Sequence, residues 1–157
     1  IEPKFIVADE PTSMLDVSIR IGVMQLMEDL ADRFGVSYLY ITHDLAVARY
    51  MTDEIGVMYL GKMVERAETE ELLKNPLHPY TKALLAATPV PDPRFGRDPI
   101  IIKGGISKAI NPPPECRFIE RCPFAAEVCR TNPHPPLEQR GDRFLVGLQN
   151  SFPNPVV

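Results

Sequence analysis

Apolar and polar positions alternate in blocks over the first half of the chain. Residues 4–8 and 36–42 are nearly continuous apolar runs, which is typical of parallel strands covered on both faces. Between these runs, helical spacing relates six apolar residues, namely Ile19, Val23, Leu26, Met27, Leu30 and Phe34. Asp16 stands where a helix cap is expected and Gly35 where a helix ends. This strand–helix–strand order predicts an α/β fold with a mainly parallel sheet.

Shorter elements follow as far as residue 88. We expect a helix over residues 44–51, strands over 55–60 and 63–67, and short helices over 68–74 and 79–87. Gly61-Lys62 separates the two strands and is typical of a tight hairpin. From Pro89 onward the composition changes, since 11 of the 17 prolines lie between Pro89 and Pro136. Proline at this density excludes long helices.

The composition disfavours several classes of function and location. The net charge is −4, and the Lys and Arg residues are scattered, which indicates no nucleic-acid partner. No apolar run approaches the ~20 residues that span a bilayer, and the first residues lack the pattern of a secretory signal. Three cysteines, an odd number, favour a reducing compartment. We therefore expect a cytoplasmic location.

Polar residues of types that are common in catalytic and metal sites follow both predicted strands. Asp9 and Glu10 end the first strand, and His43 ends the second. Ligands of open α/β sheets bind beyond the carboxyl ends of strands, where one carboxylate can hold Mg²⁺ and another can orient an attacking water. Taken singly, the acid pair is more typical of a solvated turn, and the histidine is more typical of a turn residue or helix cap.

Two longer strings favour the catalytic interpretation. Asp9 to Asp16 reads D-E-P-T-S-M-L-D, which resembles the Walker B motif and D-loop of ABC-type ATPases, and residues 42–44 read T-H-D, which resembles their switch histidine. The resemblance implies that Asp9 holds the Mg²⁺ of Mg-ATP, that Glu10 is the catalytic base and that His43 reaches the γ-phosphate. It also implies that the loop ending at Asp16 meets a second ATPase subunit.

A third string narrows the family. Residues 75–85 read N-P-L-H-P-Y-T-K-A-L-L, which resembles the C-terminal extension of ATPases that serve oligopeptide, dipeptide and nickel importers. The resemblance implies the C-terminal half of a P-loop (RecA-like) ABC ATPase domain over residues 1–67 and a Pro/Cys-rich extension over residues 68–157. We expect His78 and Tyr80 to be structural.

The family resemblance also implies partners and a place of action. ATP hydrolysis would energise uptake of oligopeptides or dipeptides through two transmembrane permease subunits, fed by an extracytoplasmic peptide-binding protein. A second ABC ATPase subunit, identical or paralogous, would complete a dimer at the cytoplasmic face of the membrane. Nickel uptake by the same subfamily stays open. A DNA-repair ATPase shares the first two strings, but residues 75–85 and the acidic charge disfavour it.

Two motifs of such ATPases do not occur in the sequence. There is no G-x-x-x-x-G-K-[ST] string for the backbone nest around the phosphates, and no L-S-G-G-Q-type signature. Ile1 stands almost at the first strand, so we expect a piece of a longer chain. Alone it should be inactive and should expose apolar surface that belongs to a core.

Cys116, Cys122 and Cys129 lie within one proline-bounded segment. They are either free thiols or ligands of a structural metal ion. The segment resembles the C-R-F-x-x-R-C-P string of family extensions, which are expected to hold a [4Fe–4S] cluster where a fourth cysteine follows. Here Val146 stands at that fourth position, and His134 is the one obvious substitute. A non-catalytic iron–sulfur or interaction module is therefore the alternative function.

Overall fold

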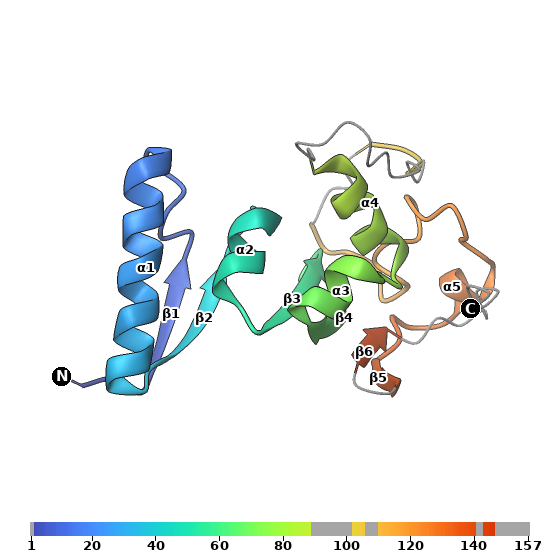
Figure 1. Ribbon diagram of the computed structural model, residues 1–157. Coiled ribbons are helices and arrows are strands. Elements are labelled where there is room, and N and C mark those ends of the chain that lie inside the picture. The colour runs from blue at the N-terminus through green and yellow to red at the C-terminus, as the bar shows by residue number, and fades with distance from the viewer. Residues whose placement is uncertain (1, 89–101, 106–109, 141–142, 147–157) are drawn as a thin grey trace. The chain divides into compact units, whose positions relative to one another are not determined.

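The computed structural model describes residues 2–88, 102–105, 110–140 and 143–146 (Figure 1). The chain divides into two compact units, Ile1–Asp53 and Glu54–Val157, and each is described by itself. In the described part of the chain, no helix is both long enough and apolar enough to cross a membrane.

The first unit is a strand–helix–strand motif followed by one more helix. It contains β1 (Phe5–Asp9), α1 (Val17–Phe34), β2 (Ser37–Ile41) and α2 (Leu45–Met51). β1 and β2 pair in parallel, from Phe5 opposite Ser37 to Asp9 opposite Ile41. The predicted α/β class is confirmed, and both strands end at the same edge of this small sheet.

Helix α1 ends as predicted and packs differently from the prediction. Gly35 takes the left-handed conformation, with φ of 60°, and its N–H donates to the Ala31 carbonyl. Asp16 occupies the N-cap position, but its side chain makes no capping hydrogen bond. The expected apolar face is wrong in part, because Ile19, Leu26 and Phe34 are about half exposed or more, while the buried residue is Met24.

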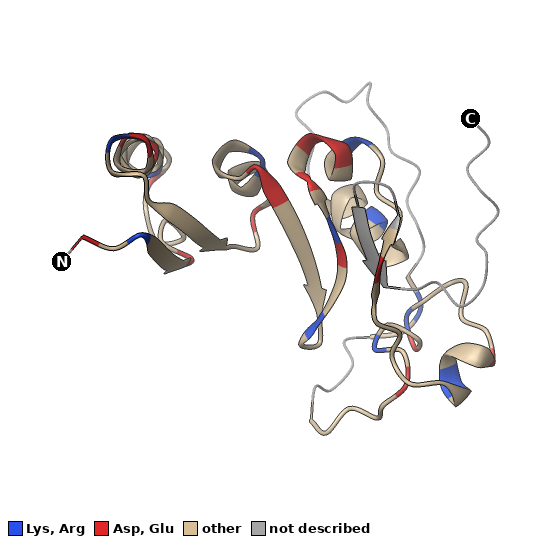
Figure 2. Cartoon of the chain, turned by 90° about the horizontal axis from the view of Figure 1, so that it is seen from below, with Lys and Arg blue, Asp and Glu red and all other residues tan. Residues whose placement is uncertain are grey.

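One face of the β1–β2 sheet is exposed. Side chains alternate between the faces of a strand, and Phe5, Val7, Leu39 and Ile41 all stand at exposed positions, with Phe5 58% and Val7 56% accessible. Figure 2 shows these two strands almost free of charged residues. The expectation that both faces are covered is therefore wrong for the described residues, whereas the expected exposure of core-type surface is confirmed.

The second unit is built on an antiparallel sheet of four strands in the order β3-β4-β6-β5. Its elements are β3 (Glu54–Tyr59), β4 (Lys62–Glu68), α3 (Thr69–Lys74), α4 (Pro79–Ala87), α5 (Val128–Thr131), β5 (Leu137–Arg140) and β6 (Arg143–Val146). The predicted hairpin is confirmed, but its turn lies one residue earlier than the expected Gly61-Lys62: β3 and β4 join through Leu60 and Gly61, whose φ angles of 44° and 74° suit a tight turn of primed type.

The expectation of a mainly parallel sheet is wrong for the described strands. Parallel pairing is confined to β1 and β2, because β4 pairs on one side with its hairpin partner β3 and on the other with β6. Strand β6 comes from the proline-rich part of the chain, and its Phe144 lies opposite Arg66. The hairpin therefore belongs to the same compact unit as the extension.

An aromatic cluster forms the centre of the second unit. The Tyr59 ring lies 4.7 Å from that of Tyr80 and 5.2 Å from that of Phe118, measured between centroids. His78 lies 5.7 Å from Phe118. Phe118 is almost fully buried, so the cysteine segment is anchored on the hairpin. This packing explains why the hairpin belongs to the second compact unit, which begins at Glu54.

Candidate active site

The ends of β1 and β2 bring the predicted catalytic residues to one edge. The Glu10 N–H donates to the Ile41 carbonyl at 2.9 Å, which continues the parallel ladder by one residue. The backbone of Glu10 then turns left-handed, with φ of 44°, and ends the strand. His43 follows two residues after Ile41, so both side chains leave neighbouring strand ends.

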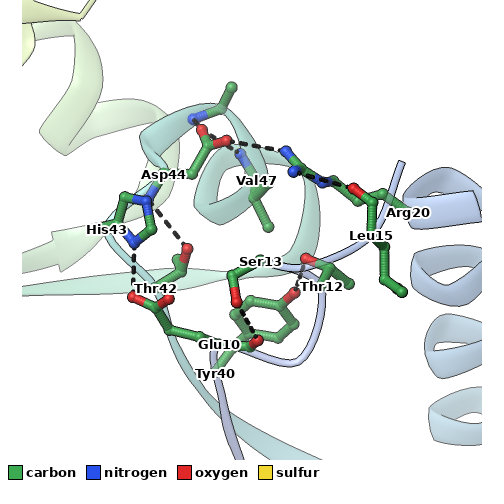
Figure 3. A network of polar contacts seen from close by, with 11 residues as sticks. Glu10, Thr12, Ser13, Leu15, Arg20, Tyr40, Thr42, His43, Asp44 and Val47 are labelled. Atoms are coloured by element: carbon green, nitrogen blue, oxygen red, sulfur yellow. Dashed lines mark hydrogen bonds and ion pairs between the residues drawn. The ribbon is translucent and has the colours of Figure 1, made fainter. Parts of the chain in front are cut away.

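Glu10 and His43 contact each other directly. The His43 Nδ1 lies 2.6 Å from the Glu10 Oε1, as Figure 3 shows. A carboxylate only accepts, so Nδ1 carries the hydrogen. This hydrogen bond and the charge of Glu10 raise the pKa of His43 above its ordinary value, and Asp44 adds a smaller rise. The expectation that His43 lies at the same edge as Glu10 is confirmed.

Two further carboxylates of the predicted site are exposed and uncommitted. No hydrogen bond or ion pair of the described residues engages the side chain of Asp9, which ends β1, or that of Asp16, which precedes α1. Exposed carboxylate oxygens are the ligands that Mg²⁺ takes from proteins, so Asp9 fits the metal. The sequence contains no glycine-rich lysine loop of the kind that surrounds phosphates, so a backbone nest for phosphates is not among these residues.

The loop after β1 is held by two turns and one side-chain contact. The Ser13 N–H and hydroxyl donate to the Glu10 carbonyl at 3.2 and 3.1 Å, and the Leu15 N–H donates to Thr12. The buried Thr12 hydroxyl shares a hydrogen bond of 3.0 Å with the Tyr40 hydroxyl. The loop is thus fixed to β2 next to the Glu10–His43 pair.

Asp44, the residue after His43, caps α2 and contacts α1. One of its oxygens accepts the N–H groups of Ala46 and Val47 at 2.9 and 3.3 Å, which caps α2. The other oxygen lies 3.5 Å from Arg20 of α1. Arg20 also reaches the Leu15 carbonyl at 3.5 Å (Figure 3). Asp44 was expected inside α2 and not as its cap, and no local pattern marks Arg20, Thr12 or Tyr40, because their partners are distant along the chain.

The histidine and tyrosine of residues 75–85 lie in the interior of the second unit. His78 is 4% exposed, and its Nδ1 accepts the Tyr80 N–H at 3.1 Å, which caps α4. Burial lowers the pKa of His78 to about 4, with a smaller effect from His134. These contacts support the expected structural role.

Glu65 is a buried residue that the sequence did not single out. It is 0% exposed in β4, and its two oxygens accept the N–H groups of Leu77 and His78, each at 2.9 Å. It therefore holds the loop that leads into α4. No signal in the sequence separates this Glu from an ordinary exposed strand residue.

The cysteine segment does not fit a four-thiolate cluster. Cys116, Cys122 and Cys129 are half-buried free thiols, and burial raises the pKa of Cys116 and Cys122. Within the described ranges, no three His, Cys, Asp or Glu side chains are grouped so as to hold a metal ion. The His134 Nδ1 accepts the Arg117 N–H at 3.2 Å, so in the neutral ring the buried Nε2 carries the hydrogen and cannot ligate.

The known proteins that this chain resembles are ATP-binding proteins of peptide transport. A family model described as "Oligopeptide/dipeptide transporter, C-terminal region" matches residues 64–129. The chain is 49% identical to the dipeptide transport ATP-binding protein DppF of Haemophilus influenzae, over 93% of the chain and 44% of that protein. It is 49% identical to the oligopeptide transport ATP-binding protein AppF of Bacillus subtilis, over 83% of the chain and 40% of the relative.

A third relative is the di/tripeptide transport ATP-binding protein DppF of Pseudomonas aeruginosa, which is 47% identical over 83% of the chain and 41% of the relative. The chain spans less than half the length of each of these three relatives.

Proposed function

The chain belongs to the family of oligopeptide/dipeptide transport ATP-binding proteins, and from that premise we propose that it is part of an ATP-hydrolysing subunit that energises uptake of oligopeptides or dipeptides. The observation that carries the proposal is the contact between Glu10 and His43 at the ends of two parallel strands. The names of the relatives support ATP binding and peptide transport as the general role.

Each residue at the strand ends has a distinct task in this proposal. Asp9 offers an uncommitted carboxylate to Mg²⁺, which neutralises phosphate charge when it is bound. Glu10 accepts a proton from, and orients, the attacking water. His43, with its Nδ1–H fixed by Glu10 and its pKa raised, presents the opposite ring nitrogen to the transferred phosphate.

The remaining partners follow from the same proposal. The exposed loop that ends at Asp16 would meet a second ATPase subunit, while the phosphate-binding loop would come from a part of the subunit outside these 157 residues. Two permease subunits and an extracytoplasmic peptide-binding protein would complete the importer at the cytoplasmic face of the membrane. By itself, the 157-residue chain should not turn over ATP, because positioning of the phosphates supplies most of the catalysis.

Substitution of Glu10 in the complete subunit tests the proposal. Glu10→Gln keeps the size of the side chain and removes its basicity, so ATP binding should persist while the hydrolysis rate falls about 100-fold or more. Glu2→Gln, at an exposed position before β1, is the matched control and should leave both unchanged. Normal turnover by Glu10→Gln would remove Glu10 from the proposed role.

A further inference from the structure

Main-chain contacts bring two of the three cysteines together. The Cys116 N–H donates to the Cys129 carbonyl at 3.2 Å, across 13 positions of sequence. Two further contacts close the same loop, from the His134 N–H to the Pro114 carbonyl and from the Arg117 N–H to the His134 ring. Residues joined by a main-chain hydrogen bond have adjacent Cα atoms, as a disulfide requires.

The third cysteine is placed differently. The N–H of Cys122 donates to Ile119 and its carbonyl accepts from Ala125, so its main-chain contacts are local turns. Another turn joins Ile119 to Cys116, which puts two successive turns between Cys116 and Cys122. The backbone therefore pairs Cys116 with Cys129, while the Cys122 thiol lies near enough to both that their charges contribute to its raised pKa.

We propose that Cys116 and Cys129 form a reversible disulfide in place of the iron–sulfur cluster that the family resemblance suggests. All three thiols are free and half-buried, so the pair is accessible to a small oxidant. The bond closes the loop that carries Phe118 and Ile119, the two most deeply buried residues of the segment. Phe118 and Ile119 are already buried while the thiols are free, so oxidation adds a covalent link across a loop whose anchor is in place.

The oxidant is a low-molecular-weight disulfide such as glutathione disulfide. One cysteine thiolate, having lost its proton to solvent, attacks this disulfide, which forms a mixed disulfide and releases one glutathione thiolate. The second cysteine thiolate attacks the protein sulfur of the mixed disulfide, which forms the Cys116–Cys129 bond and releases the second glutathione. The protein loses two electrons and two protons, and glutathione disulfide becomes two glutathione molecules.

Thiol mapping of the complete subunit tests the proposal. The protein is purified anaerobically, assayed for iron, incubated with excess glutathione disulfide, alkylated and digested. Cleavage after Glu115, Glu120 and Glu127 places the three cysteines on three separate peptides, so the three possible links give different peptide pairs. We expect less than one iron atom in ten chains and one Cys116–Cys129 link, with Cys122 alkylated.

Single serine variants provide the controls. Cys122→Ser should form the link to the same extent as the unchanged protein, while Cys116→Ser and Cys129→Ser should each form none. Stoichiometric iron lost on any Cys→Ser change, three alkylated thiols after oxidation, or a link through Cys122 would each overturn the proposal. Loss of ATP hydrolysis by Glu10→Gln does not depend on any of these outcomes, so the two proposals fail separately.

Discussion

The left-handed backbone of Glu10 is held by its neighbours. A φ of 44° is uncommon for a residue with a Cβ and costs of the order of 1 kcal/mol. The Glu10 N–H donates to Ile41, its carbonyl accepts from Ser13, and its side chain meets His43. These contacts over-determine the conformation, as is usual for residues that must present a side chain at a functional site.

The effect of the Glu10 charge on the pKa of His43 should be measurable. Because the hydrogen bond and charge of Glu10 are the main causes of the raised pKa of His43, Glu10→Gln should lower that pKa towards its ordinary value of 6.5. The ring proton shifts of His43, followed by NMR across pH 5 to 9 (a range of roughly two units around the usual histidine values), report this change.

Asp9→Asn is the control for this titration. Asp9 is not among the groups that shift the pKa of His43, so the variant should leave the titration unchanged. An equal pKa for His43 in the unchanged protein and in Glu10→Gln would show that the pair is not formed in solution.

The burial of His78 leads to a prediction about how the stability of the fold depends on pH. The pKa of His78 is about 4 in the folded chain and 6.5 when unfolded, so the unfolded chain takes up the proton first as the pH falls. The stability that depends on neutral His78 is complete above pH 6.5 and is lost as the pH falls towards 4, by about 3 kcal/mol in total.

Urea denaturation at several pH values checks this dependence. His78→Asn keeps an acceptor for the cap of α4 but does not titrate, so its stability should fall less steeply below pH 6.5. His43→Asn changes an exposed ring and should not reduce the acid slope. Equal slopes for the unchanged chain and His78→Asn would contradict the burial of a neutral ring.

At the scale of elements, local signals and long-range pairing differ in how far they could be predicted. The end of α1 at Gly35 and the turn at Gly61 followed from the conformational freedom of glycine, whereas Asp44 was expected inside α2 and was not predicted as its cap. Strands β5 and β6 were not predicted, because the β5 sequence Leu-Glu-Gln-Arg lacks apolar alternation and β6 joins the sheet through pairing with β4, which is distant in sequence.

The connection between β4 and α4 depends on one buried carboxylate. Removing it with Glu65→Ala leaves the N–H groups of Leu77 and His78 buried without their acceptors, which should cost about 3 kcal/mol of unfolding free energy. Glu68→Ala removes an exposed carboxylate that caps α3 and should cost about 1 kcal/mol. Chemical denaturation compares the two, and an equal or smaller loss for Glu65→Ala would argue against its anchoring role.

At the scale of the whole molecule, the candidate site was predictable and the packing around it was not. The pairing of Glu10 with His43 followed from two strand ends that a parallel sheet must bring together. The antiparallel sheet of the second unit and the anchor at Phe118 depend on contacts between segments far apart in sequence. Such contacts produce no periodic pattern in the sequence.

The exposed face of the β1–β2 sheet should make the 157-residue chain self-associate. Apolar faces of this kind are usually covered, and Val7 and Leu39 lie within it. We expect dimers or larger species at micromolar concentration by light scattering, and a shift to monomer in the double variant Val7→Lys with Leu39→Lys. Met14→Lys, in the loop after β1, is the control and should not shift the mass. A monomeric unchanged chain would contradict this reading of the exposed face.

The most direct test of the account is a double-mutant cycle on ATP hydrolysis by the complete subunit. If Glu10 and His43 act on the same phosphate as one unit, Glu10→Gln and His43→Ala should each lower turnover about 100-fold or more. The double variant should then be no more than about 10-fold slower than the worse single variant. Losses that multiply in full, or a single variant with normal turnover, would contradict the claim that the two residues form one catalytic pair.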